Sequence, residues 1–213
     1  MPRPSRASPD RILAAAAAEF ARRGYSGARV DRIARRAGVN KAMLYYHFRS
    51  KQALYRTILG RVFRLAGERL QAIASSGLTP DAKIDRVIAL IATFVRDHDF
   101  FPAIMLREIA ERGAHLDRDT LAAMAVLPQS VARIVQEGVA ERRFRPIDPL
   151  AAYFIMLPPI LFYLAGAPIR KALSDRHVLN LPSIGPEAFV RCLQQSMRLA
   201  LASTAQAPAE EQT

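Results

Sequence analysis

The chain has 213 residues, of which 51% are hydrophobic, and this is enough for one or two domains with a sizeable core. Its 10 glycines, 14 prolines and 8% aromatic residues exclude collagen-like, low-complexity and wholly disordered chains. The single cysteine, Cys192, excludes a disulfide framework and a zinc site of paired thiolates, and it suits the reducing cytoplasm. A formal net charge of +12 makes a polyanion the first partner to consider.

Helical patterns run along the whole chain, and no segment shows the alternation that is typical of strands. The expected fold class is therefore all-α. Pro9 suits the first position of a helix that Gly24 ends, and Ser50 suits the cap of a later, longer one. The expected helices cover about 9–23, 30–37, 41–47, 51–75, 81–97, 102–112, 118–143, 149–165 and 186–203.

The positive charge is concentrated in the first 60 residues. This segment holds 13 Lys and Arg against three acidic residues, whereas the rest of the chain holds 18 against 16. A strongly basic segment joined to a nearly neutral remainder indicates two separate tasks, and the basic segment is the one suited to a polyanion.

Residues 28–51 have the spacing of a helix-turn-helix. Ala34 is small enough for two steeply crossing helices to approach, Gly38 adopts a positive φ in the turn at no steric cost, and Leu44 anchors the second helix. The second helix of this motif enters the DNA major groove. Many core helices contain such a spacing, so its specificity comes from the basic charge and the capped helix before it.

A set of residues around this motif matches one known family. The set comprises Gly24-Tyr25, Val30, Ile33-Ala34, Ala37-Gly38-Val39, Leu44-Tyr45, His47-Phe48 and Ser50-Lys51. It resembles the DNA-binding domain of the TetR/AcrR family of transcription regulators, over about residues 8–64. The resemblance implies a homodimer, an N-terminal three-helix reader and a C-terminal domain that binds a small effector.

The outward side of the second helix follows from its inward side, which Leu44 and Phe48 define. A step of about 100° per residue turns four apolar or aromatic side chains outward, namely Ala42, Met43, Tyr45 and Tyr46. Small apolar groups contact thymine methyls and tyrosine hydroxyls reach phosphates, so this side suits duplex DNA.

The family resemblance assigns roles to the neighbouring polar residues. Tyr45 and Lys51 are expected to hold the DNA backbone, Lys41 to reach a base edge and His47 to contact a phosphate. Arg29 stands where the family commonly carries Thr or Ser, and we expect it to contact a phosphate by charge. The predicted DNA-binding residues are Arg29, Lys41, Ala42, Met43, Tyr45, Tyr46, His47 and Lys51.

These observations predict three regions along the chain. Residues 8–64 form the DNA-binding domain, with the reader motif at about 29–48. Residues 65–204 form a helical domain for effector binding and dimerisation, and 205–213 form a disordered tail.

The effector is expected to be small and apolar or amphipathic, because the central helices offer apolar side chains that are able to line a cavity. The same side chains suit ordinary core packing equally well. The candidates are Ile91, Phe94, Phe101, Met105, Leu127, Phe154 and Met156.

Residues 149–169 form an uncharged run that is long enough to cross a bilayer. Pro158 and Pro159 interrupt the backbone hydrogen bonding that lipid requires, so we expect this run between protein surfaces and no membrane partner. The apolar stretches 150–165 and 189–201 are the predicted homodimer seam.

The predicted function is a ligand-responsive repressor that binds a palindromic operator on double-stranded DNA as a dimer. Two alternatives stay open: a non-specific cationic binder of RNA or membrane surfaces, and a small-molecule enzyme in the C-terminal body. The sequence has no Gly-x-Ser-x-Gly elbow, Walker loop or His-Glu-x-x-His motif, so neither an enzyme nor a cofactor is expected.

One group of polar residues has the spacing of metal ligands. Glu108, Glu111 and His115 are spaced to share one face of a helix. Gly113 interrupts that helix, and the neighbouring arginines offer simpler ion pairs. The sequence therefore predicts no metal site.

Overall fold

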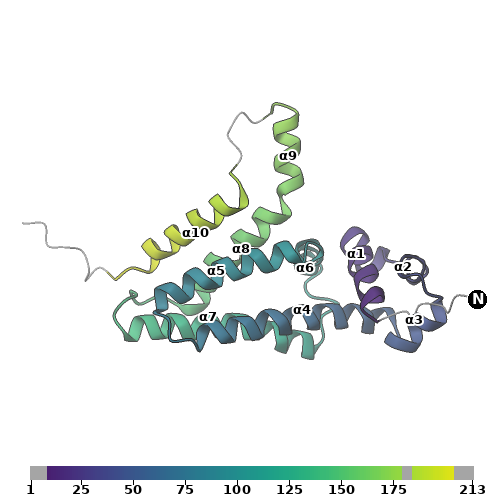
Figure 1. Cartoon of the computed structure of the whole chain (residues 1–213), viewed down its shortest axis with the longest axis horizontal. Helices are drawn as coiled ribbons and strands as arrows, with labels where there is room; N and C mark the ends of the chain where they lie inside the picture. The colour runs from purple at the N-terminus through teal and green to yellow at the C-terminus, as the bar shows by residue number, and fades with distance from the viewer. Residues whose placement is uncertain (1–8, 179–183, 204–213) are drawn as a thin grey trace, which may run out of the picture. The chain divides into compact units, whose positions relative to one another are not determined.

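The computed structural model describes residues 9–178 and 184–203, and within these ranges it is all-α (Figure 1). The helices are α1 (Pro9–Gly27), α2 (Val30–Ala37), α3 (Lys41–Phe48), α4 (Lys51–Ala74), α5 (Pro80–Asp97), α6 (Phe100–Ala110), α7 (Arg118–Ala140), α8 (Pro149–Ala165), α9 (Ala167–Asp175) and α10 (Pro186–Leu201). This confirms the predicted fold class. The predicted tail, 205–213, lies outside the described residues.

The two main differences from the sequence prediction are the end of α1 and an additional helix, α9, while the other helices begin and end within about three residues of their predicted positions. Gly24 does interrupt α1, with a φ of 69° and a ψ of 175°, but a further turn extends the helix to Gly27. The second difference is α9, which the sequence analysis missed. Gly166 and Pro168 separate α9 from α8, and at the sequence level this pair indicates only a break, because proline suits the start of a helix as well as its end.

The chain forms two compact units, each with its own core. The first contains residues 9–65 together with 98–124, and the second contains 66–97 and the described residues from 125 onward. In the first unit α1 packs on α2 and on α6, around fully buried side chains such as Phe20 and Leu44. The predicted boundary at residue 65 places 98–124 in the C-terminal region, whereas the contacts of these residues group them with the N-terminal helices.

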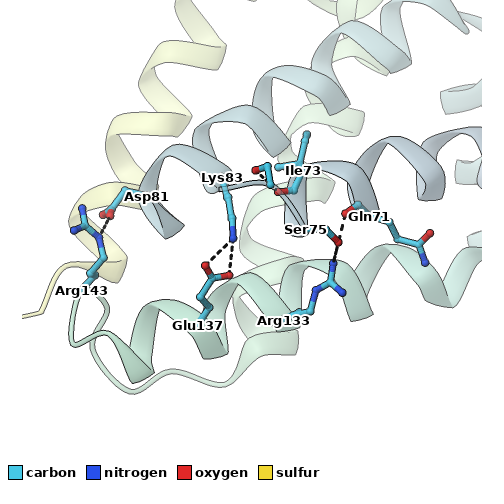
Figure 2. A network of polar contacts seen from close by, with 9 residues as sticks. Gln71, Ile73, Ser75, Asp81, Lys83, Arg133, Glu137 and Arg143 are labelled. Atoms are coloured by element: carbon cyan, nitrogen blue, oxygen red, sulfur yellow. Dashed lines mark hydrogen bonds and ion pairs between the residues drawn. The ribbon is translucent and has the colours of Figure 1, made fainter. Parts of the chain in front are cut away.

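A polar network in the second unit ties α5 to α7 (Figure 2). The ammonium of Lys83 donates to both carboxylate oxygens of Glu137, at 2.6 and 2.7 Å. Arg143, beyond the end of α7, pairs with Asp81 in the first turn of α5, with Nε and Oδ2 2.5 Å apart. These two ion pairs join α5 to α7 and to the residues just after it, at two separate points near the start of α5.

No single helix among the described residues is both long enough and apolar enough to cross a membrane. The pair α8 and α9 meets these requirements only when taken together, and it is bent by 49° at the break between the two helices.

The two partners in the Lys83–Glu137 pair differ in burial, since their side chains are 4% and 31% exposed. Glu137→Gln leaves a buried ammonium without its carboxylate, and we expect it to lower the free energy of unfolding by about 2–4 kcal/mol. Lys83→Met leaves a carboxylate that water reaches, and its expected cost is under about 1.5 kcal/mol. Urea denaturation at equal protein concentrations compares them, and equal losses would contradict this asymmetry.

Candidate functional site

The turn between α2 and α3 has the geometry that the sequence predicts. Gly38 has a φ of 68°, and its N–H donates to the carbonyl groups of Ala34 and Arg35. Asn40 then caps α3, because its Oδ1 accepts a hydrogen bond from the N–H of Met43 at 2.7 Å. Glycine relieves the strain of the left-handed turn, and the cap satisfies one of the free N–H groups at the start of α3.

The inward side of α3 is formed by Leu44 and Phe48, which are both buried. They belong to the same core as the buried Ile33 and Ala34 of α2. The side chains of the opposite surface are exposed, as the helical spacing predicts, and Tyr46 is 81% exposed. The exposed residues of α3 are Lys41, Ala42, Met43, Tyr45 and Tyr46.

Lys41, the first residue of α3, pairs with Asp31 of α2, with Nζ and Oδ1 3.1 Å apart. The hydrogen bond to Asp31 raises the pKa of Lys41 above its ordinary value. Both side chains are more than half exposed, and an exposed pair of this kind contributes little free energy. Lys41 is therefore free to exchange Asp31 for another acceptor at small cost.

Lys51 lies at the first position of α4. Ser50 caps this helix, because its Oγ accepts from the N–H of Ala53 at 3.0 Å. The ammonium of Lys51 lies 4.6 Å from the centroid of the Tyr25 ring and donates to the carbonyl of Ser26 at 3.4 Å. Burial lowers the pKa of Lys51. A lysine held beside a helix N-terminus forms a positive site suited to an anion.

The other two predicted polar residues lie at the ends of the motif. Arg29 is exposed at the N-cap of α2, and its side chain makes no capping hydrogen bond. His47 is half-buried in the last turn of α3, with its ring centroid 5.3 Å from that of Tyr46. The α3 helix contains no acidic residue, so this end of the first unit presents positive and aromatic groups.

A side chain of α6 holds α1 through a contact that the sequence does not predict. The guanidinium of Arg107 donates to the carbonyls of Phe20 at 3.0 Å, Ala21 at 2.5 Å and Arg22 at 3.3 Å. These carbonyls lie directly before the interruption at Gly24, where the helical hydrogen bonding of α1 is broken. No local pattern announces such a partner, because the residues are more than 80 positions apart.

The candidate effector residues divide by burial. Phe101 is half-buried and Phe154 is 59% exposed, while the other five are buried. None of the seven lines the cavity of about 340 Å³ in the second unit. This cavity lies between α5, α8 and α10, and its lining includes Ala92, Arg96, Ile160, Tyr163, Phe189 and Val190.

The predicted dimer seam contains one exposed apolar face. Four large apolar side chains of α8 are between 49% and 72% exposed, namely Leu150, Phe154, Ile155 and Phe162. The apolar stretch 189–201 on α10 differs, because Met197 and Leu201 are buried within the chain's own second unit. Leu199 of α10 is 73% exposed.

Comparison with known protein families gives two matches along the chain. Residues 12–58 match the family described as bacterial regulatory proteins, tetR family. Residues 80–182 match the family described as tetracyclin repressor-like, C-terminal domain.

Individual proteins are similar over most of the chain. The HTH-type transcriptional regulator RutR of Escherichia coli K12 is 30% identical over 164 residues, which are 76% of this chain and 76% of RutR. The HTH-type transcriptional repressor NicS of Pseudomonas putida is 25% identical over 173 residues, 80% of this chain and 78% of NicS. The structure of the ketosteroid transcriptional regulator KstR2 of Mycobacterium tuberculosis has the same fold, with a TM-score of 0.71 and 20% identity over 94% of this chain and 97% of KstR2.

The Asn40 cap has a measurable consequence for the first unit. Asn40→Ala removes the acceptor for the Met43 N–H, and we expect it to lower the free energy of unfolding by about 1 kcal/mol. Asn40→Ser keeps an acceptor and should restore most of this loss. Thermal unfolding followed by circular dichroism tests the pair, and a serine variant as unstable as the alanine variant would show that the side chain does not act as a cap.

Proposed function

The chain belongs to the TetR family of transcriptional regulators, and from this premise we propose that it is a repressor that an effector releases from a palindromic operator. Its helix-turn-helix binds DNA, and the family's regulators are not enzymes. The C-terminal domain of the family generally binds an effector and dimerises. The similarity to NicS, which is named a repressor, supports repression, and membership of a bacterial regulatory family supports action in the cytoplasm.

The outward face of α3 is the observation that carries this proposal. Tyr46 is 81% exposed and Met43 is 41% exposed, and such a face is unfavourable in water unless a partner covers it. A major groove provides thymine methyls for Ala42 and Met43 and a base edge for Lys41. Phosphates accept from Tyr45, Tyr46, His47, Arg29 and Lys51.

We propose that residues 8–64 read DNA and that residues 65–204 bind the effector and a second copy of the chain. In a symmetric dimer two α3 helices must meet major grooves about 34–36 Å apart. An effector releases the operator only if it binds more tightly to a dimer with a different spacing.

The cavity between α5, α8 and α10 is our proposed effector site. Ala92, Ile160 and Val190 give it apolar walls, and Arg96 adds a positive group. Arg96 pairs with Glu187 at 3.5 Å, and both side chains are more than half exposed, so the pair is weak. These features fit a small amphipathic molecule with a negatively charged or polar end.

We place the dimer seam on the exposed apolar face of α8. Helices from two chains bury such a face without any change of fold, and a symmetric interface uses the same patch twice. Leu199 supplies an exposed apolar group on α10, consistent with a contribution from that helix.

Binding across a range of salt concentrations tests the reader. A duplex selected from random sequence and an unselected duplex serve as probes. We expect a steeply negative dependence of log K on log salt, since phosphate contacts release counterions. Lys51→Ala should weaken binding to both duplexes by a similar factor, about tenfold per protomer. Met43→Ala should instead change which bases are preferred.

Three results would overturn this assignment. A salt slope near zero would contradict binding led by phosphates. Identical behaviour of Lys51→Ala and Met43→Ala would contradict the separation of positioning from reading residues. Equal affinity for the selected duplex, random duplex, RNA and anionic vesicles would identify a non-specific cationic binder instead.

The seam is tested by placing a charge on it. Phe162→Glu puts two unpaired carboxylates into a symmetric apolar interface, and we expect the dimer dissociation constant to rise at least about 100-fold. Ile109→Glu is the matched control, because Ile109 is 65% exposed on α6, outside α8 and α10, against 72% for Phe162. Sedimentation equilibrium measures both. Dissociation of the Ile109 variant, with Phe162→Glu still dimeric, would move the interface away from α8.

A further inference from the structure

Three metal-ligand side chains converge at the end of α6, outside the DNA-facing helix. Glu108, Glu111 and His115 each offer one ligand atom, and these atoms lie within 4.8 Å of one another. Nδ1 of His115 is 2.9 Å from Oε1 of Glu108 and 3.3 Å from Oε2 of Glu111. Tetrahedral zinc with ligands at about 2.0–2.2 Å keeps its donor atoms roughly 3.3–3.6 Å apart. Small adjustments therefore suffice to admit the ion.

The turn after α6 brings these residues together by a route that helical spacing does not predict. The α6 helix ends at Ala110, and Arg112 and Gly113 follow with φ values of 57° and 71°. This turn folds the chain back, so that the N–H of His115 approaches Oε2 of Glu108 at 3.4 Å. The interruption at Gly113, which argued against a shared helix face, is part of what delivers His115 to the glutamates.

Side chains from the neighbouring helices hold two of these ligands in place. Tyr55 of α4 is buried, and its hydroxyl donates to Oε1 of Glu108 at 2.6 Å. The ring centroid of Tyr25 lies 4.0 Å from that of His115. Outer contacts of this kind orient metal ligands and strengthen metal binding.

The charge balance of the cluster favours a cation. The side chain of Glu108 is only 2% exposed, and a second carboxylate, Glu111, faces the same imidazole. The adjacent Arg107 directs its guanidinium to the carbonyls of α1. A buried carboxylate is costly without a compensating positive charge, and a divalent ion supplies two.

We propose that Glu108, Glu111 and His115 form a binding site for a divalent transition metal, with Zn²⁺ as the best match. One imidazole nitrogen and two carboxylate oxygens are a ligand set that zinc accepts, with a water in the fourth position. Ca²⁺ and Mg²⁺ prefer oxygen ligands only. Because Tyr25 and Tyr55 belong to α1 and α4, the bound ion stabilises the whole first unit. The site is independent of the proposed DNA and effector functions.

Equilibrium dialysis of the chelator-treated full chain against Zn²⁺ tests the site directly. The experiment uses a Cys192→Ser background, because Cys192 is an exposed thiol and thiolates are zinc ligands in general. We expect one Zn²⁺ per chain and a rise in melting temperature. His115→Ala and Glu111→Gln should each weaken binding by at least tenfold. His177→Ala is the matched control, since it removes an exposed imidazole elsewhere, and it should bind as the parent does.

Two further variants keep the outcome decisive. Glu111 is 40% exposed, so Glu111→Gln leaves the buried Glu108–Tyr55 hydrogen bond intact and should not unfold the chain. Tyr55→Phe keeps the ring but removes that hydrogen bond, and we expect about 10- to 100-fold weaker binding. The proposal is wrong if the parent binds no stoichiometric zinc, or if His115→Ala and Glu111→Gln bind it as tightly as His177→Ala.

Discussion

The packing of α3 against the rest of the first unit is the constraint on which the remaining structure depends. The helix has eight residues, and an isolated helix of that length is not stable in water. Leu44 and Phe48, both buried, supply the apolar contact that holds it. Because these two side chains point inward, the helical repeat places Tyr46 and Met43 on the opposite, exposed side of α3. The same packing that makes α3 stable therefore creates the surface that we propose reads DNA.

The first unit also depends on contacts that come from α6. Arg107 satisfies carbonyls at the interruption of α1, and Glu108 accepts from Tyr55 of α4. Two adjacent residues of one helix thus contact α1 and α4 of the same unit. Because the two residues are adjacent on α6, any change in the position of α6 alters both contacts at once.

Sequence reasoning succeeded where the information is local. The Ala34, Gly38 and Leu44 spacing predicted the helix-turn-helix, because close approach, a positive φ and an inward anchor each require a particular residue type. Reasoning failed where partners are distant, as for Tyr55 and Glu108, which are 53 positions apart. The residues that line the cavity could not be predicted from the sequence either. Side chains that line a cavity and side chains that fill a core share the same chemistry, and packing alone separates them.

The uncharged α8 shows how one composition serves different environments. Length and apolarity suit a bilayer only when α8 is joined to α9, yet Tyr153 and Met156 of α8 are buried against protein. The side that includes Phe162 stays exposed in a single chain. Pro158 and Pro159 remove two backbone donors from α8, which costs little where neighbouring protein compensates and much in lipid. The proposed seam, in which a second copy of the chain covers this face, is an environment in which the interrupted backbone is tolerable.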